Sequence, residues 1–312
     1  MEIDTAITQL SGDRFTAIAV PLFVLAIVLE VLVSWRTQRD LYVARDFLIS
    51  MSMLVLSAII DFVPKAVAFV SFYYLHEWSP LRDVVERQAW AWVMLFFLDD
   101  LIYYWFHRAN HEVRLFWAGH VPHHSSVKLN LGTALRQGVG ERIHKYWFWL
   151  PLPLLGFDPL MIFTMISLNL IYQFWVHTEL VRKMPSVIEL ILNTPSHHRV
   201  HHASNIRYLD CNHAGVLIIW DRLFGTFSEE QIKEQPTYGL TKNINSYNPA
   251  RVAAGEYVNL FRDVLSAVTI KDRLRYIFLA PGWHPDGYDH RARTLRAQID
   301  QHQPSITDSI IT

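Results

Sequence analysis

The chain has 312 residues, of which 51% are apolar or aromatic and 18% are charged, and its mean hydropathy is +0.14. This composition excludes a disordered, fibrous or nucleic-acid-binding chain, and a net charge of −1 gives no field that attracts polyanions. Cys211 is the single cysteine, which excludes an intramolecular disulfide and favours a reducing compartment.

The first apolar run covers residues 15–35 and carries one charge, Glu30, in 21 residues. At about 1.5 Å per helical residue, a helix of this length crosses a hydrocarbon layer of about 30 Å. A cleaved signal peptide needs a basic start and a small-residue cleavage site, whereas residues 1–14 carry three acidic residues and one arginine. We therefore predict an uncleaved membrane-spanning helix.

Three more apolar runs follow, at 47–63, which can extend toward Tyr74, at 89–106 and at 146–176. The first two are predicted to cross the membrane. The last is 31 residues long and carries a Gly, an Asp and a Pro within 156–159. Because these residues favour a turn, we expect this run to enter the membrane and return to the same side as a hairpin.

Together these runs predict an all-α integral membrane protein with about four membrane-embedded helical segments plus a hairpin, and a cytoplasmic helical cap. The alternative, that the runs are buried helices of a soluble protein, is disfavoured because four such runs lie within the first 176 residues. Residues 1–312 are expected to form a single domain. Its catalytic core is predicted at about 89–230, followed by a C-terminal cytoplasmic extension at 231–312.

Basic residues predict the orientation of the chain. Segments 36–46, 107–145 and 178–202 carry three, six and three Lys or Arg residues, whereas residues 1–14 carry one. The positive-inside rule therefore places these three segments in the cytoplasm and the N-terminus outside. We expect a multi-pass protein, in the inner membrane if its source is bacterial, with its active site on the cytoplasmic side.

Sixteen histidines are present, and eleven of them lie between His107 and His202. Eight fall into three groups whose spacing places the imidazoles on one face of a helix: His107 and His111; His120, His123 and His124; His198, His201 and His202. Neutral imidazoles bind iron, zinc and copper. Because eight ligands exceed the coordination of one ion, we predict two metal ions. Isolated histidines such as His144 are expected to be ordinary core or surface residues.

The ligand type indicates which metal is bound. A catalytic zinc site normally has three protein ligands and a nearby carboxylate base. The larger, nearly all-nitrogen set predicted here favours two redox-active iron ions, with zinc as a possible occupant in purified protein. Ferritin-like diiron proteins instead use two Glu-x-x-His motifs together with further Glu residues, and this signature is absent here.

Two carboxylates are predicted to be catalytic. Glu112 adjoins His111, where it can balance the charge of the metals or relay protons. Asp100 lies on the same helical face as His107 and can accept the far N–H of a ligand histidine. For Asp100 and its neighbour Asp99, a location at the cytoplasmic interface is the alternative.

The motifs H-x3-H at 107–111, H-x2-HH at 120–124 and H-x2-HH at 198–202 resemble those of the fatty acid hydroxylase and sterol desaturase superfamily. Within it, the segments YYWFHRANHEVRLFWAGHVPHHSS, FWVHTE, LNTPSHHRVHH and GVLIIWDRLFGTF are similar to the alkylglycerol monooxygenase family and its bacterial members. The resemblance implies that the eight histidines of the motifs bind the metals, with His177 as a ninth ligand. Gln173 stands where some relatives carry histidine.

The resemblance implies a membrane-bound diiron monooxygenase that uses O2 to hydroxylate a lipid C–H bond, with a glycerol ether lipid as substrate and tetrahydrobiopterin as external electron donor. The alternative enzyme is a sterol or fatty acid desaturase or hydroxylase that receives electrons from a ferredoxin or cytochrome. A metal transporter is a more distant alternative, because its ligands would lie along a path within the membrane. The expected partners are a bilayer lipid, O2 and an electron-donor protein, without nucleic acid.

Overall fold

The computed structural model describes residues 14–302, which form helices and isolated β-bridges but no β-strand. The predicted all-α class is therefore confirmed for these residues. In chain order the elements are α2 (Arg14–Arg36), α3 (Ala44–Ile60), α4 (Phe62–Glu77), α5 (Arg82–Val85), α6 (Ala89–Glu112), α7 (Arg114–His124), η1 (Thr133–Leu135), α8 (Arg142–Trp149), α9 (Pro151–Leu154), α10 (Pro159–Trp175), α11 (Ser186–Ile191), α12 (Pro195–His201), η2 (Ile206–Tyr208), α13 (Ile219–Phe224), α14 (Pro249–Ser266), α15 (Ile270–Phe278) and α16 (Ala292–His302).

Two helical stretches are long and apolar enough to cross a membrane, Ile18–Arg36 within α2 and the whole of α6. The pair α3 and α4, bent by 45°, is a third candidate if it counts as one broken span. Two to three spans are therefore supported, at the positions of the three crossings that the sequence predicts, and Pro159–Trp175 in the predicted hairpin is a shorter apolar helix. The side that each end faces stays a prediction, and the predicted outside position of the N-terminus falls on residues 1–13, outside the described residues.

The break between α3 and α4 has a local cause. Pro64 lacks an N–H group, and its ring clashes with the carbonyl group four residues earlier, which is that of Ile60, the last residue of α3. Asp61 occupies the break and is buried, and its carboxylate accepts a hydrogen bond of 2.6 Å from Arg142 on α8. The second apolar run therefore continues as a helix beyond residue 63, but at a changed angle.

The predicted hairpin at 146–176 is formed by α8 and α9 on one side and α10 on the other. Gly156 lies in the turn with a φ of +90°, and a Cβ atom there would lie 2.6 Å from the Leu81 carbonyl oxygen. Asp158 caps α10, since its side chain accepts a hydrogen bond of 2.7 Å from the N–H of Leu160. These residues place the turn where the sequence predicted it.

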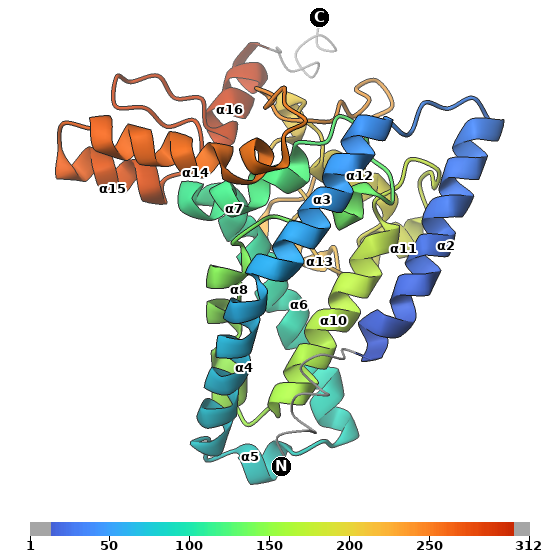
Figure 1. The fold of residues 1–312 in the computed structure, drawn as a ribbon, viewed down its shortest axis with the longest axis vertical. Helices are drawn as coiled ribbons and strands as arrows, with labels where there is room; N and C mark the ends of the chain where they lie inside the picture. The colour runs from blue at the N-terminus through green and yellow to red at the C-terminus, as the bar shows by residue number, and fades with distance from the viewer. Residues whose placement is uncertain (1–13, 303–312) are drawn as a thin grey trace, which may run out of the picture.

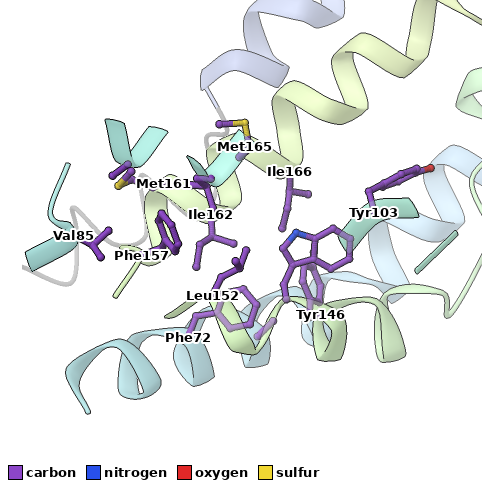
Figure 2. Close-up of a cluster of buried hydrophobic side chains, with 14 of the residues drawn as sticks. Phe72, Val85, Tyr103, Tyr146, Leu152, Phe157, Met161, Ile162, Met165 and Ile166 are labelled. Carbon is purple, nitrogen blue, oxygen red and sulfur yellow. The ribbon is translucent and has the colours of Figure 1, made fainter. Parts of the chain in front are cut away.

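The largest apolar core joins this hairpin to α4 and α6. Figure 2 shows Phe72 from α4, Tyr103 from α6, and Tyr146, Leu152 and Ile162 from the hairpin in one cluster. The side chains of Phe72, Leu152 and Ile162 are fully buried. This packing holds the first half of α10 beside α6.

Helices α2, α3, α4 and α10 run roughly along the long axis of the molecule (Figure 1). Helices α7 and α12 lie toward one end, and α14 and α15 lie across that end. Helix α7 packs against both α6 and α14. The segments that carry the histidine motifs are thereby gathered at one end of the apolar helices.

Candidate metal centre

Nine buried histidines come together at this end of the molecule. They lie at the end of α6, in α7, just after α10, and in α12 with its C-cap: His107, His111, His120, His123, His124, His177, His198, His201 and His202. The structure thus gathers the eight histidines of the three motifs in one cluster with His177, the ninth residue implied by the resemblance.

The nine side chains form two groups, and within each group one nitrogen per ring lies within 4.8 Å of the others. The five-histidine group contains His107, His111, His120, His124 and His201. The four-histidine group contains His123, His177, His198 and His202. The groups adjoin, because the rings of His124 and His202 stack with centroids 4.5 Å apart. This geometry suits two ions side by side.

Within each group the Nε2 atoms face one another. In the five-histidine group, the Nε2 atoms of His107 and His124 lie 3.1 and 3.2 Å from Nε2 of His120. In the four-histidine group, Nε2 of His198 lies 2.9 Å from Nε2 of His177. A neutral imidazole has one N–H donor and one acceptor nitrogen. The protonation of these inner nitrogens therefore depends on the partners of the outer ones.

We call the ring nitrogen that points away from its group the outer nitrogen. Most outer nitrogens that have a partner lie against a backbone carbonyl oxygen. Four Nδ1 atoms lie 2.7 to 3.2 Å from such oxygens: His107 with His213, His123 with Arg136, His177 with Gln173 and His201 with Cys211. A carbonyl oxygen only accepts, so each Nδ1 donates its proton and leaves a lone pair on Nε2. Lone pairs that converge in this way repel one another and are stabilised by cations. The residues present therefore fit bound metal ions.

The electrostatic environment favours the same neutral state. Burial, followed by repulsion between neighbouring imidazoles, lowers the pKa of His123, His124, His198, His201 and His202 well below its usual value. Burial also lowers the pKa of His177, to about 4. Imidazoles must be neutral to bind a metal ion, so these rings are ready to act as ligands near neutral pH.

Helix α12 begins at residues that favour a helix start. Thr194 is the N-cap and Pro195 is the first helical residue. The buried carboxylate of Glu189 accepts hydrogen bonds from the hydroxyl groups of Thr194 and Ser196, at 2.9 and 2.6 Å. It also lies 2.9 Å from Nε2 of His197. These contacts fix the first turn, and the next turn presents His198, His201 and His202 to the centre.

Comparison with known proteins assigns the segment that contains these ligands. Residues 92–226 match the family described as fatty acid hydroxylase, and this range includes all nine histidines. Residues 92–226 belong to the fatty acid hydroxylase family. The resemblance read from the three motifs is therefore confirmed, and this range is called the hydroxylase domain below.

Relatives that match between 58% and 86% of the chain are lipid-modifying enzymes by name. The chain is 40% identical over 268 residues to alkylglycerol monooxygenase of Danio rerio and 40% identical over 269 residues to that of Homo sapiens, which covers 86% of this chain and 59% of each relative. It is 28% identical over 195 residues to an ornithine lipid hydroxylase of Rhizobium tropici, covering 58% of this chain and 55% of that protein. The chain spans about three-fifths of the alkylglycerol monooxygenases it matches. No solved structure matches it.

Asp100 supports a loop of the hydroxylase domain instead of a ligand histidine. Its carboxylate accepts hydrogen bonds from the backbone N–H groups of Val216 and Leu217, at 2.7 and 2.9 Å, and from the indole N–H of Trp220 at 2.9 Å. The predicted contact with a histidine is absent from its hydrogen bonds because Asp100 lies about 10 Å along the helix from His107. Asp99 similarly accepts hydrogen bonds from other polar side chains, those of Trp149 and Asn169.

The loop held by Asp100 approaches α6 closely at Gly215. A Cβ atom at Gly215 would lie 2.6 Å from Oδ1 of Asn169 and 2.9 Å from Oδ1 of Asp100. On the other side of the loop, the carboxylate of Asp221 accepts hydrogen bonds of 2.7 and 2.8 Å from the N–H groups of His213 and Ala214. The two aspartates thereby position the His213 carbonyl that accepts from His107.

Glu112 lies away from the nine histidines. Its side chain is 47% exposed and accepts a hydrogen bond of 2.9 Å from Nε of Arg108, one turn earlier in α6. Consecutive residues of a helix point about 100° apart, so the side chain after His111 leaves the face that carries His107 and His111. Arg108 in turn donates a hydrogen bond of 3.1 Å to the Tyr104 hydroxyl group, which lies 2.9 Å from that of Thr226.

Two other carboxylates contact the ligand rings, and the sequence analysis did not select them. Oδ1 of Asp210 lies 3.2 Å from Nδ1 of His111, and Oε1 of Glu141 lies 3.5 Å from Nδ1 of His120. Burial opposes ionisation of Glu141, but His120, Lys145 and His144 together lower its pKa to about 2. Both residues lie outside the motifs, so no spacing along a helix could have indicated them.

His213 is a third residue that the sequence analysis missed. It is fully buried, and neither ring nitrogen has a hydrogen-bond partner. Its ring centroid lies 5.0 Å from that of His111 and 5.8 Å from that of His201. His144, also set aside, donates a hydrogen bond of 2.8 Å from Nε2 to the amide oxygen of Asn110, whose NH2 group donates to Glu141. A histidine near a metal centre can therefore belong to no periodic motif.

A cavity of about 810 Å³ opens onto the centre. Side chains of both groups line it: His111, His124 and His201 from the five-histidine group and His202 from the four-histidine group. The opposite wall includes Glu256 of α14, Tyr276 of α15 and Trp283. The cavity is large enough for part of a lipid or for a small organic cofactor.

Proposed function

We propose that this chain is a membrane-bound monooxygenase that hydroxylates a C–H bond of a lipid at a centre of two iron ions. The observation that carries the proposal is the convergence of nine buried imidazoles in two adjoining groups, four of which line a large cavity. The names of the relatives support an ether lipid as substrate. Because the chain spans only part of those proteins, the substrate belongs to the proposal.

When bound, paired iron ions would supply O2 activation and the removal of hydrogen from the substrate carbon. One oxygen atom enters the lipid and the other leaves as water, so each turnover needs two electrons and two protons from outside the centre. The electrons are proposed to come from tetrahydrobiopterin, as the family resemblance implies, or from an electron-donor protein.

The chain's own residues hold the ligands in one protonation state and keep water away. Asp210 accepts the outer N–H group of His111, and the carboxylate of Glu141 lies 3.5 Å from the outer nitrogen of His120. Both carboxylates orient these rings and raise their basicity. Carbonyl oxygens orient the rings of His107, His123, His177 and His201. Because the rings are buried, the metal ions would be shielded from solvent except through the cavity.

A different class of membrane lipid is the alternative substrate, and the ornithine lipid hydroxylase relative supports it. A sterol or fatty acid desaturase or hydroxylase fed by a ferredoxin or cytochrome belongs to the same chemistry. Transport of metal is disfavoured, because the nine rings gather in one compact centre and not along a path across the membrane.

Lipid mass spectrometry after turnover with isotopically labelled O2 tests the proposal. The purified, iron-loaded chain is given an alkylglycerol, a sterol or a fatty acid, each with tetrahydrobiopterin or with a ferredoxin system. We expect one labelled oxygen atom in the alkylglycerol product, or in the aldehyde to which it decays. His201→Ala should give none, and His76→Ala, which changes a histidine on α4, should react normally. Product formation by His201→Ala at the normal rate would contradict the proposal.

A further inference from the structure

Helices α14 and α15 form a hairpin, and its inner face packs on the rest of the molecule. Leu260, Ala267 and Tyr276 are buried in a cluster of their own. Helix α14 packs against α7 and α3, and α15 packs against α14 and α7. Tyr276 and Glu256 also line the cavity above the histidines. One apolar face of the hairpin is therefore already used within the chain.

The hairpin has a second apolar face, and this one is exposed. We call the outer face the exposed side chains of Val258, Phe261, Leu265, Val268, Ile270, Leu274 and Phe278. On α14 and on α15 they recur every three or four residues, so each helix presents a continuous stripe. Phe261 is 63% exposed and Ile270 is 74% exposed. A helix that is apolar on two faces is normally buried on both, in protein or in lipid.

Basic side chains flank the outer face. Arg251 and Arg262 lie beside the α14 stripe and Lys271 beside the α15 stripe, and all three are exposed. The acidic residues of α14 face inward, because Glu256 and Asp263 both bind Arg114 of α7, at 2.8 and 2.6 Å. The outward charge of the hairpin next to its apolar stripe is therefore positive.

The hairpin lies at the end of the candidate spans. In Figure 1, α14 and α15 run across the long axis, at the same end as the C-terminus of α2, and project sideways beyond α7 and α8. This end carries the basic segments 36–46 and 107–145, which are predicted to be cytoplasmic. The cytoplasmic leaflet is the one that carries anionic phospholipids.

We propose that the α14–α15 hairpin lies in the headgroup region of the bilayer, with its outer face against the acyl chains and its basic side chains on anionic phospholipid headgroups. A helix with an apolar stripe bordered by Lys and Arg binds membranes in this way. Because the inner face of the same hairpin lines the cavity, the hairpin joins the bilayer to the metal centre. This assignment concerns the binding surface and does not depend on the reaction.

Spin-label accessibility in lipid nanodiscs with anionic phospholipid tests the proposal. Phe261→Cys and Leu274→Cys place a label on the outer face, and Asn259→Cys places one on the polar side of α14, where the residue is also exposed. Burial raises the pKa of the Cys211 thiol to about 11, so this thiol should react slowly with the label. The unsubstituted chain, labelled in parallel, measures this background. We expect labels at 261 and 274 to collide several-fold more with O2, relative to a water-soluble nickel complex, than the label at 259.

Two results would overturn the proposal. Equal collision ratios at the three positions would place the outer face in water. Spin–spin broadening at 261 that disappears on dilution with unlabelled chain would show that a second copy covers the face instead of lipid. Neither readout requires catalytic activity, so the proposed function can fail without affecting this test.

A charge reversal tests the anionic lipid. Arg262→Glu together with Lys271→Glu, in the chain labelled at 261, should lower the collision ratio in anionic nanodiscs and have a smaller effect in zwitterionic ones. An identical ratio with and without the reversal, in both lipids, would overturn the assignment of an anionic surface.

Discussion

The five-histidine group and the four-histidine group differ in what holds their outer nitrogens. In the first, two carboxylates contact the rings, Asp210 at 3.2 Å from His111 and Glu141 at 3.5 Å from His120. In the second, the outer nitrogens that have partners lie against backbone carbonyl oxygens. A carboxylate partner makes an imidazole more basic than a carbonyl does, so the five-histidine group is the stronger candidate to hold its ion tightly.

The two groups also differ in their access to the cavity. Three rings of the five-histidine group line it, but only His202 of the four-histidine group does. The unpaired ring of His213 lies beside the five-histidine group as well. The same kind of motif therefore produces two unequal sites, and the difference comes from the loops around them.

Ligand removal should give the largest effects and should be unequal. His123→Ala leaves three imidazoles in the four-histidine group, whereas His201→Ala leaves four in the other. We expect His123→Ala to lower the metal content from two ions per chain to about one, and His201→Ala to lower it less. Activity should be lost in both variants, because each removes one of the proposed metal ligands. Metal analysis and turnover, with His76→Ala as control, check this. Full metal and full activity in both variants would show that the histidine assignment is wrong.

Removing the carboxylate of Glu141 should weaken one site selectively. Glu141→Gln keeps the hydrogen bond from Asn110 but loses the charge beside His120. We expect metal affinity at the five-histidine group to fall about 10- to 100-fold, the usual effect of losing such a partner, with the four-histidine group unaffected. Competition with a chelator measures both affinities, and Glu229→Gln on the surface is the control. Equal weakening of both sites would contradict the distinction drawn between them.

His213→Leu should stabilise the metal-free chain more than the metal-bound chain. The change removes two buried nitrogens without partners, which should stabilise the metal-free chain by about 1–3 kcal/mol. If His213 serves the five-histidine group, the metal-bound chain gains less, and its metal is released more easily. Thermal unfolding with and without metal measures the difference. The same stabilisation in both states would show that His213 has no role at the centre.

Glu112→Gln should have the smallest effect. We retain the proposal that Glu112 aids turnover, but it now acts through Arg108 and Tyr104 and not by contact with a ligand. A partly exposed ion pair contributes up to about 1 kcal/mol, which corresponds to roughly fivefold in rate. We therefore expect normal metal content and a reduction in turnover of that size or less. Arg108→Gln should behave in the same way, and loss of metal in either variant would place the pair nearer to the centre than the structure does.

Much of this protein follows from short-range patterns. The apolar runs indicate where helices of membrane-crossing length form, and α2 and α6 appear there. The Gly, Asp and Pro residues within 156–159 predict the turn of the hairpin, since each has a local conformational preference. The spacing of the histidines predicts ligands on one helical face, because the period of a helix is local. The motifs in order were sufficient to recognise the family.

Other features depend on contacts between segments far apart in the sequence. His123 belongs to the same H-x2-HH motif as His120 and His124, yet it joins the other group. Its ring leaves the face that its neighbours share and contacts the ring of His177. Glu141 and His213 reach the centre through loops, and no periodicity describes a loop. The partner of the buried Asp61 carboxylate at the bend is likewise Arg142, which lies on another helix.

The division between sequence and tertiary structure has one physical reason. Side chains on one helix are related by a fixed rotation and rise per residue, so a pattern in the sequence is also a pattern in space. The relation between two helices is set by how their surfaces pack and how the loops close. The sequence alone therefore determined the ligand type and the apolar helices. Only the packing of α6, α7, α10 and α12 decided how nine rings divide into five and four, and which carboxylates support them.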